Sequence, residues 1–205
     1  MISVDIQHRL NAYNGLQKLH VKREFAIGSI TKILGPSGVG KTTFLKIIAG
    51  FIQPDQGSIA VDGAAWLDTA SGIFIPPQKR MAGFVFQDYA LFPNMTVREH
   101  LEYATSDDTW INRLLTLGKL EPFARHKPSY LSGGQQQRLA ILRALANRPK
   151  LLLMDEPFSA LDQEMRADLI VALKSLFHEL GTTVLIVSHY PQELEGLTDL
   201  YLDLS

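Results

Sequence analysis

The sequence predicts an α/β fold with a mostly parallel sheet, an antiparallel β part at the N-terminus and a small helical lobe. Short apolar runs alternate with helical patterns, which is the order typical of βαβ units. Three of the four main runs end in a polar residue or a glycine-rich loop, where open α/β sheets bind ligands. With 205 residues, 46% of them hydrophobic, the chain suits one domain over residues 1–205.

The first expected element is an N-terminal strand, because Ile2, Val4 and Ile6 alternate with polar residues. Four more strands are expected in the runs FAIGSITKILG (25–35), GFVFQ (83–87), KLLLMDE (150–156) and TTVLIVSH (182–189). Helices are expected in KTTFLKIIAG (41–50), GGQQQRLAILRALAN (133–147) and QEMRADLIVALKSLFHEL (163–180). Apolar spacing of three and four over residues 96–130 favours helix, so we expect a helical lobe at about residues 90–147, inserted in the core.

The composition of the chain excludes several classes of protein and of binding site. The chain has 20 Lys and Arg against 21 Asp and Glu, so no basic field indicates a nucleic-acid partner. It has no cysteine, which excludes disulfides and thiolate metal sites. The N-terminus lacks the layout of a signal peptide, and the apolar run IIAGFI is far shorter than the ~18 residues of a membrane span. We therefore expect a cytoplasmic protein.

A complete phosphate-binding loop, GPSGVGKT, occupies residues 35–42 and fits the pattern G-x-x-x-x-G-K-[ST]. It lies between an expected strand and an expected helix, as this motif requires. Its glycines let backbone amides face phosphate oxygens, and the helix N-terminus adds partial positive charge. Lys41 would contact the β and γ phosphates, and Thr42 would bind Mg²⁺. The predicted nucleotide-binding residues here are Gly35, Pro36, Ser37, Gly38, Val39, Gly40, Lys41, Thr42 and Thr43.

A pair of carboxylates, Asp155 and Glu156, follows the apolar run LLLM. Such a run predicts a buried strand that directs both side chains to the open end of the sheet. We expect Asp155 to hold Mg²⁺ and Glu156 to polarise the attacking water. Alone, an acidic pair at a strand end is usually a helix cap or a solvated turn. Its combination with the phosphate loop favours the catalytic interpretation.

Several motifs together resemble the nucleotide-binding subunit of ATP-binding cassette (ABC) transporters. They are GFVFQD (83–88), LSGGQQQR (131–138), LLLMDEPFSALD (151–162) and VSH (187–189), beside the phosphate loop, and they occur in the family's order. The resemblance runs from about Ile2 to Tyr201. It implies a P-loop NTPase core that hydrolyses ATP with Mg²⁺ and pairs with a second copy of itself. It also implies integral membrane subunits as partners, with the chain peripheral on the inner face of the membrane.

The LSGGQ motif resembles a second phosphate cradle. In this family, the motif of each subunit closes over the ATP held by the other subunit's phosphate loop. The resemblance thus assigns nucleotide binding to Ser132, Gly133, Gly134 and Gln135. Ser132 is a good helix N-cap, and the glycines leave the helix N-terminus open to an anion. Without the family, SGG before a helix would more often be only a cap.

The remaining matches each have an ordinary alternative. Gln87 resembles the glutamine that contacts Mg²⁺ and the attacking water, or is a glutamine at a buried edge. His189 resembles the histidine that contacts the γ phosphate, and the other histidines are interpreted as surface or core residues. The loop SALD (159–162) resembles one that crosses the dimer interface beside Glu156, or is an ordinary helix start. Tyr13 lies where the family's adenine-stacking aromatic residue sits, but LNAYNG is turn-like, so a surface position is the alternative.

The type of ABC protein follows from what surrounds the motifs. The short segment between Gln87 and Leu131 argues against the long inserts of DNA-repair members, and the chain has no fused membrane part. It therefore resembles a separate importer subunit. Residues 72–97 resemble importers of molybdate, sulfate, sugars and polyamines, and IPPQKR (75–80) looks closest to molybdate. Many members of that group continue into a C-terminal regulatory domain, whereas this chain stops at Ser205, so we do not expect regulation by substrate bound there. The alternative is a non-transport or release-type ABC ATPase that acts on a cell-division or lipoprotein-release membrane complex.

Overall fold

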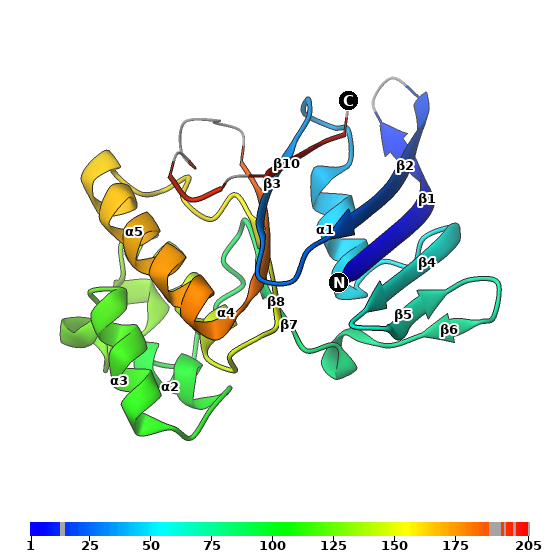
Figure 1. Ribbon diagram of the computed structural model, residues 1–205. Coiled ribbons are helices and arrows are strands. Elements are labelled where there is room, and N and C mark those ends of the chain that lie inside the picture. The colour runs from blue at the N-terminus through cyan, green and yellow to red at the C-terminus, as the bar shows by residue number, and fades with distance from the viewer. Residues whose placement is uncertain (13–14, 189–193, 195, 199, 205) are drawn as a thin grey trace.

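The computed structural model describes residues 1–12, 15–188, 194, 196–198 and 200–204. Within these residues, two five-stranded sheets enclose helix α1 (Lys41–Ala49), and the other helices cover the far face of the second sheet (Figure 1). The predicted α/β fold is therefore confirmed. No described helix has the length and apolar character needed to cross a bilayer.

The first sheet is antiparallel and has the order β2-β1-β4-β5-β6. Its strands are β1 (Ile2–Ala12), β2 (Gly15–Phe25), β4 (Gln56–Val61), β5 (Ala64–Asp68) and β6 (Ile73–Phe74). The alternation that predicted β1 places Ile2, Val4 and Ile6 in the core, while Ser3 and Asp5 are half-buried. The predicted antiparallel part is confirmed, although only β1 of its strands was located from the sequence.

The second sheet is parallel and has the order β10-β3-β9-β8-β7. Its strands are β3 (Ile30–Leu34), β7 (Ala82–Val85), β8 (Leu151–Asp155), β9 (Thr183–Val187) and β10 (Leu200–Asp203). In β8, Leu151 and Leu153 pack in the core around α1, whereas Leu152 and Met154 pack among the helices on the other face. Because both faces are covered, this strand is apolar at every position before its terminal carboxylate.

The predicted strand over residues 25–35 was too long. Phe25 ends β2 in the antiparallel sheet, and Ile30 begins β3 in the parallel sheet. Between them, the backbone N–H of Ser29 donates to the carbonyl of Ala26 at 3.2 Å, and Gly28 has a φ of 73°, a left-handed conformation that glycine adopts without strain. The apolar run is thus divided by a turn that carries the chain from one sheet to the other.

The helices on the far face share one core. They are α2 (Val97–Glu102), α3 (Asp108–Leu117), α4 (Gly133–Leu145) and α5 (Gln163–Leu180), with short 3₁₀ turns at Pro77–Lys79, Glu121–Phe123 and Pro128–Tyr130. Leu101, Leu114, Leu142 and Leu173 of these four helices are fully buried in it. The predicted helical character of residues 96–130 is confirmed, and the division of the chain at about residues 90–147 stays a prediction.

Arg80 holds the end of α1 from inside the core. The residue is only 3% exposed, and its Nη1 donates to the carbonyl oxygens of Ile47 at 3.0 Å and Ile48 at 2.6 Å. Its Nε donates to the carbonyl of Ile75 at 2.7 Å. Burial lowers the pKa of Arg80 to about 10, so the guanidinium is still charged at neutral pH. The cation thus lies at the negative end of the α1 dipole, which stabilises both groups.

We expect Arg80→Met to lower the free energy of unfolding by about 2–4 kcal/mol, because the buried carbonyls of Ile47, Ile48 and Ile75 lose their charged donor. Urea unfolding measures this change. Arg125→Met is the matched control, since Arg125 is exposed and its loss should shift stability little. Equal stability of the two variants would contradict this role of Arg80.

Candidate functional site

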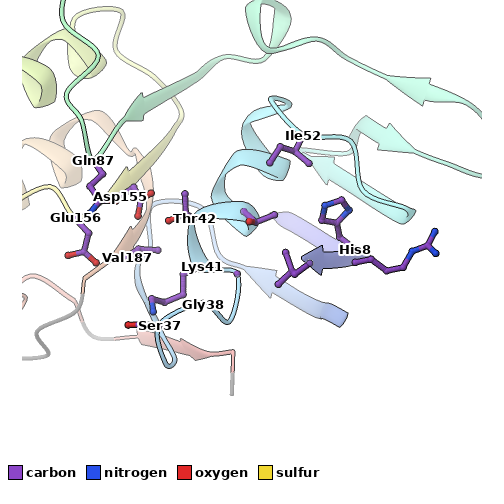
Figure 2. A pocket seen from close by; sticks show the side chains of 14 residues that line it. His8, Ser37, Gly38, Lys41, Thr42, Ile52, Gln87, Asp155, Glu156 and Val187 are labelled. Atoms are coloured by element: carbon purple, nitrogen blue, oxygen red, sulfur yellow. The ribbon is translucent and has the colours of Figure 1, made fainter. Parts of the chain in front are cut away.

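A cavity of about 480 Å³ opens where the phosphate-loop segment meets the carboxyl ends of the parallel strands (Figure 2). The loop and α1 contribute Ser37, Gly38, Gly40, Lys41, Thr42 and Thr43. The strand ends contribute Gln87, Asp155, Glu156 and Val187. Four predicted segments that lie far apart in the sequence therefore line one cavity.

The loop before α1 has a backbone that requires glycine. Gly35, Gly38 and Gly40 have φ values of 141°, 84° and 102°, all in the left-handed region. A Cβ at Gly35 would lie 2.9 Å from Cγ1 of Val39, and one at Gly40 would lie 2.7 Å from Cδ1 of Leu10. Gly40 is also the N-cap of α1 and offers no side-chain hydrogen bond, so the first amides of the helix have no side-chain cap. Such a helix N-terminus favours an anion.

Lys41 lies inside this loop. The residue is 6% exposed, and its Nζ donates to the carbonyl oxygens of Gly35 at 2.7 Å and Pro36 at 3.0 Å. A lysine ammonium has three N–H donors, so the group that holds the loop closed can also donate to a phosphate oxygen. The cation is thus already placed at the centre of the phosphate cradle.

The two carboxylates lie at the end of β8, beside the cavity. Asp155 is 3% exposed and Glu156 is 5% exposed. Glu156 has a φ of 52°, a left-handed conformation that costs a non-glycine residue about 1–3 kcal/mol. Its backbone N–H donates to the carbonyl of Val187 at 3.0 Å, which ties the turn to β9. The chain therefore maintains a strained turn at the predicted catalytic residue.

The oxygen groups in the cavity suit Mg²⁺. Gln87 follows β7 and lies near Asp155 and Glu156, and Thr42 lies in the first turn of α1 (Figure 2). In the described part of the chain, no group of three or more His, Cys, Asp or Glu could hold a metal by itself. Mg²⁺, however, is usually bound by one or two carboxylates together with substrate phosphates and water. Asp155, Thr42 and Gln87 fit that kind of site, and their assignment as ligands stays a prediction.

The SGGQ segment, residues 132–135, lies outside this cavity, at the N-terminus of α4. The Ser132 hydroxyl accepts a hydrogen bond from the Gln135 backbone at 3.3 Å, and Gln135 Oε1 accepts one from the Ser132 backbone at 2.8 Å. A Cβ at Gly133 would meet only the Cβ of Ala160, at 3.9 Å, so the start of the helix is open on that side. The structure therefore does not bring the two predicted phosphate cradles together within one chain.

Two predicted site residues, Tyr13 and His189, lie outside the described residues. Sequence reasoning missed the wall opposite the carboxylates, which includes His8 and Ile52 (Figure 2), and it also missed Leu10 among the residues that line the cavity. His8 was expected to be an ordinary surface or core histidine, but it faces the cavity, with Nδ1 3.7 Å from the Asp55 carboxylate. The alternation of apolar residues in β1 does not predict that His8 lines the cavity, because that position depends on how β1 packs beside α1.

Known proteins resemble this chain over most of its length. The profile of the family described as ABC transporter matches residues 19–159. The spermidine/putrescine import ATP-binding protein PotA of Thermotoga maritima is 40% identical in an alignment 205 residues long, which covers 96% of this chain and 54% of that protein. The molybdenum import ATP-binding protein ModC of Mesorhizobium japonicum is 40% identical in an alignment 202 residues long, which covers 96% of this chain and 53% of that protein. The chain thus spans about half the length of these relatives.

A solved structure also resembles the whole chain. It is the dimeric, post-hydrolysis state of the ATP-binding cassette MJ0796 bound to ADP and Pi. The TM-score is 0.84 at 32% identity, and the match covers 100% of this chain and 94% of that one. The similarity therefore includes both sheets and the helices between β7 and β8.

Proposed function

The chain belongs to the ABC transporter family, and from this premise we propose that it is the ATP-hydrolysing subunit of an import system. Two copies would close around two Mg-ATP and drive transport through separate membrane subunits, at the inner face of the membrane. The observation that carries this proposal is the cavity in which the phosphate loop, Gln87, Asp155 and Glu156 converge. A cation, a helix N-terminus and two carboxylates at one point are the parts that phosphoryl transfer requires.

The triphosphate would lie along the loop and the N-terminus of α1. Backbone amides of residues 37–43 would donate to its oxygens, and Lys41 would contact the β and γ phosphates. Asp155, Thr42 and Gln87 would hold Mg²⁺, which neutralises charge on the β and γ phosphates when it is bound. Glu156 would orient a water for in-line attack on the γ phosphorus and accept its proton, which gives ADP and phosphate. By the resemblance, His189 would contact the γ phosphate.

The nucleoside end of ATP would lie against the opposite wall. His8 and Ile52 are placed there, on the far side of Lys41 and Thr42 from the carboxylates (Figure 2), and Leu10 also lines the cavity. An imidazole ring and aliphatic side chains suit the flat, apolar faces of a base. Stacking of Tyr13 on adenine stays a proposal that rests on the resemblance.

The transported solute is proposed only as a small molecule. The two relatives named above are described for polyamines and for molybdenum, and both are 40% identical to this chain. The proposal of molybdate as the solute rests on the resemblance of IPPQKR (75–80). Arg80 of that motif, however, is buried against α1 and has a structural role. Co-purification with a polytopic membrane protein would support the proposed membrane partner.

We expect Lys41→Ala to weaken ATP binding by about 10- to 100-fold, because charge-assisted hydrogen bonds to phosphate contribute about 1.5–3 kcal/mol each. The variant also loses the bonds that hold the carbonyls of Gly35 and Pro36. Isothermal titration calorimetry with Mg-ATP measures the affinity. Lys46→Ala is the control, since it removes the same charge from the last turn of the same helix. Equal affinity of the two variants would overturn the nucleotide-binding proposal.

A further inference from the structure

Gln137 connects α4 to the turn that carries Glu156. The residue lies in the second turn of α4 and is 1% exposed. Its Nε2 donates to the carbonyl of Glu156 at 3.0 Å and to the Ser159 hydroxyl at 3.1 Å. Its Oε1 accepts from the backbone N–H of Ala160 at 2.9 Å. All three bonds of this buried amide therefore go to one short loop.

These bonds fix the backbone of Glu156 on both sides. The N–H of Glu156 donates to Val187 in β9, and its carbonyl accepts from Gln137 in α4 and from the Ser159 hydroxyl at 3.2 Å, the hydroxyl that Gln137 also contacts. A non-glycine residue at a φ of 52° keeps that conformation only when its surroundings enforce it. If the bonds from α4 were lost, the Ser159 hydroxyl that donates to the same carbonyl would lose its own partner Gln137, and the peptide after Glu156 could rotate towards a less strained conformation. The carboxylate would then move from its place beside the cavity.

The first turn of α4 contacts the same loop. A Cβ at Gly134 would lie 3.2 Å from the carbonyl oxygen of Ala160 and 3.3 Å from Cδ2 of Leu161. Gln137 lies about one turn further along the same face of the helix. The loop that follows the carboxylates is thus positioned relative to α4 as well as to β8.

We propose that Gln137 is a positioning residue for Glu156: its three hydrogen bonds to the 156–160 loop hold the carboxylate where it can act on the attacking water. The inference rests on the proposed ATPase function. Binding of ATP depends on the phosphate loop, which Gln137 does not contact in the described structure. Loss of these bonds should therefore affect turnover and leave affinity unchanged.

The test compares Gln137→Met and Gln137→Asn with the unchanged chain. Methionine has a similar length but forms none of the three bonds, and asparagine keeps the amide but is one methylene too short to reach all three partners. We expect kcat for ATP hydrolysis to fall by about 10- to 100-fold, as displacement of a catalytic group by about 1 Å can cause. The Kd and KM for ATP should stay within about twofold of the unchanged chain, because the cradle is intact.

Thr182→Val is the matched control for loss of a buried hydrogen bond. Thr182 is fully buried and donates to the carbonyl of Pro149 at 2.9 Å, at the opposite end of β8 and β9. It should lower stability without lowering kcat. If Thr182→Val lowers kcat as much as the Gln137 variants, or if the Gln137 variants lose ATP affinity or keep full turnover, the positioning role is wrong. If the unchanged chain hydrolyses no ATP, it is the proposed function that fails. If Gln137→Met does not fold, the kcat and Kd of Gln137→Asn test the positioning role.

Discussion

Glu156→Gln should lower kcat for ATP hydrolysis by about 10²- to 10⁴-fold and leave ATP bound, since general base catalysis contributes about that factor. Glutamine has the same size and can keep the same backbone, but its amide cannot take a proton from water. The loop, Lys41 and Thr42 are unchanged, so the phosphates keep their contacts. Loss of one negative charge beside the triphosphate should, if anything, strengthen binding. Phosphate release at saturating Mg-ATP measures kcat.

Glu164→Gln is the control for this variant. Glu164 is exposed in the first turn of α5, so the same chemical change there should leave turnover unaltered. Turnover of Glu156→Gln near that of the unchanged chain would contradict the catalytic role of Glu156. His189 would then become the first candidate for the group that activates water.

The parts of the site that a contiguous motif encodes could be predicted from the sequence. The loop 35–42 contains its glycines, cation and hydroxyl in adjacent positions, and LLLM before Asp155 encodes a strand buried on both faces. In contrast, β5 (AAWLD) and β6 (IF) are too short to show an alternation, and they form strands because β4 is available to pair with β5 and β5 with β6.

Residues whose role depends on tertiary packing were missed or misread. Arg80 was grouped with a substrate-related motif, because no local pattern shows that its guanidinium reaches the carbonyls of Ile47 and Ile48. Gln137 belongs to the quoted motif LSGGQQQR, yet its partners lie in a loop that only the fold brings beside α4. His8 is placed at the cavity by the packing of β1 against the α1 region. Local sequence patterns predict the strands, the helices and the phosphate loop. Tertiary packing decides which further side chains contact them.

We expect Ser132→Arg to abolish ATP-dependent dimerisation while ATP remains bound to each chain. Ser132 lies outside the chain's own cavity, at the start of α4, so a phosphate that meets it must come from a second copy. In the Glu156→Gln background, which retains ATP, each SGGQ segment would gain a γ phosphate from the partner. Charge-assisted contacts of about 1.5–3 kcal/mol apiece, made twice by symmetry, would favour a C2 dimer. The nucleotide-free chain should be mostly monomeric, and ADP should not suffice because it lacks that phosphate.

Size-exclusion chromatography with light scattering, together with measured nucleotide occupancy, tests this expectation. Glu156→Gln with Mg-ATP should elute as a dimer, and the double variant Ser132→Arg, Glu156→Gln as a monomer that still carries ATP. Val171→Arg in the same background controls for the added charge, because Val171 is 72% exposed on α5, and it should still dimerise. An arginine at position 132 would fill the open start of α4, which lies outside the chain's own cavity. If the double variant dimerises with ATP, or loses nucleotide as fully as Lys41→Ala does, then the SGGQ segment does not bind the partner's nucleotide.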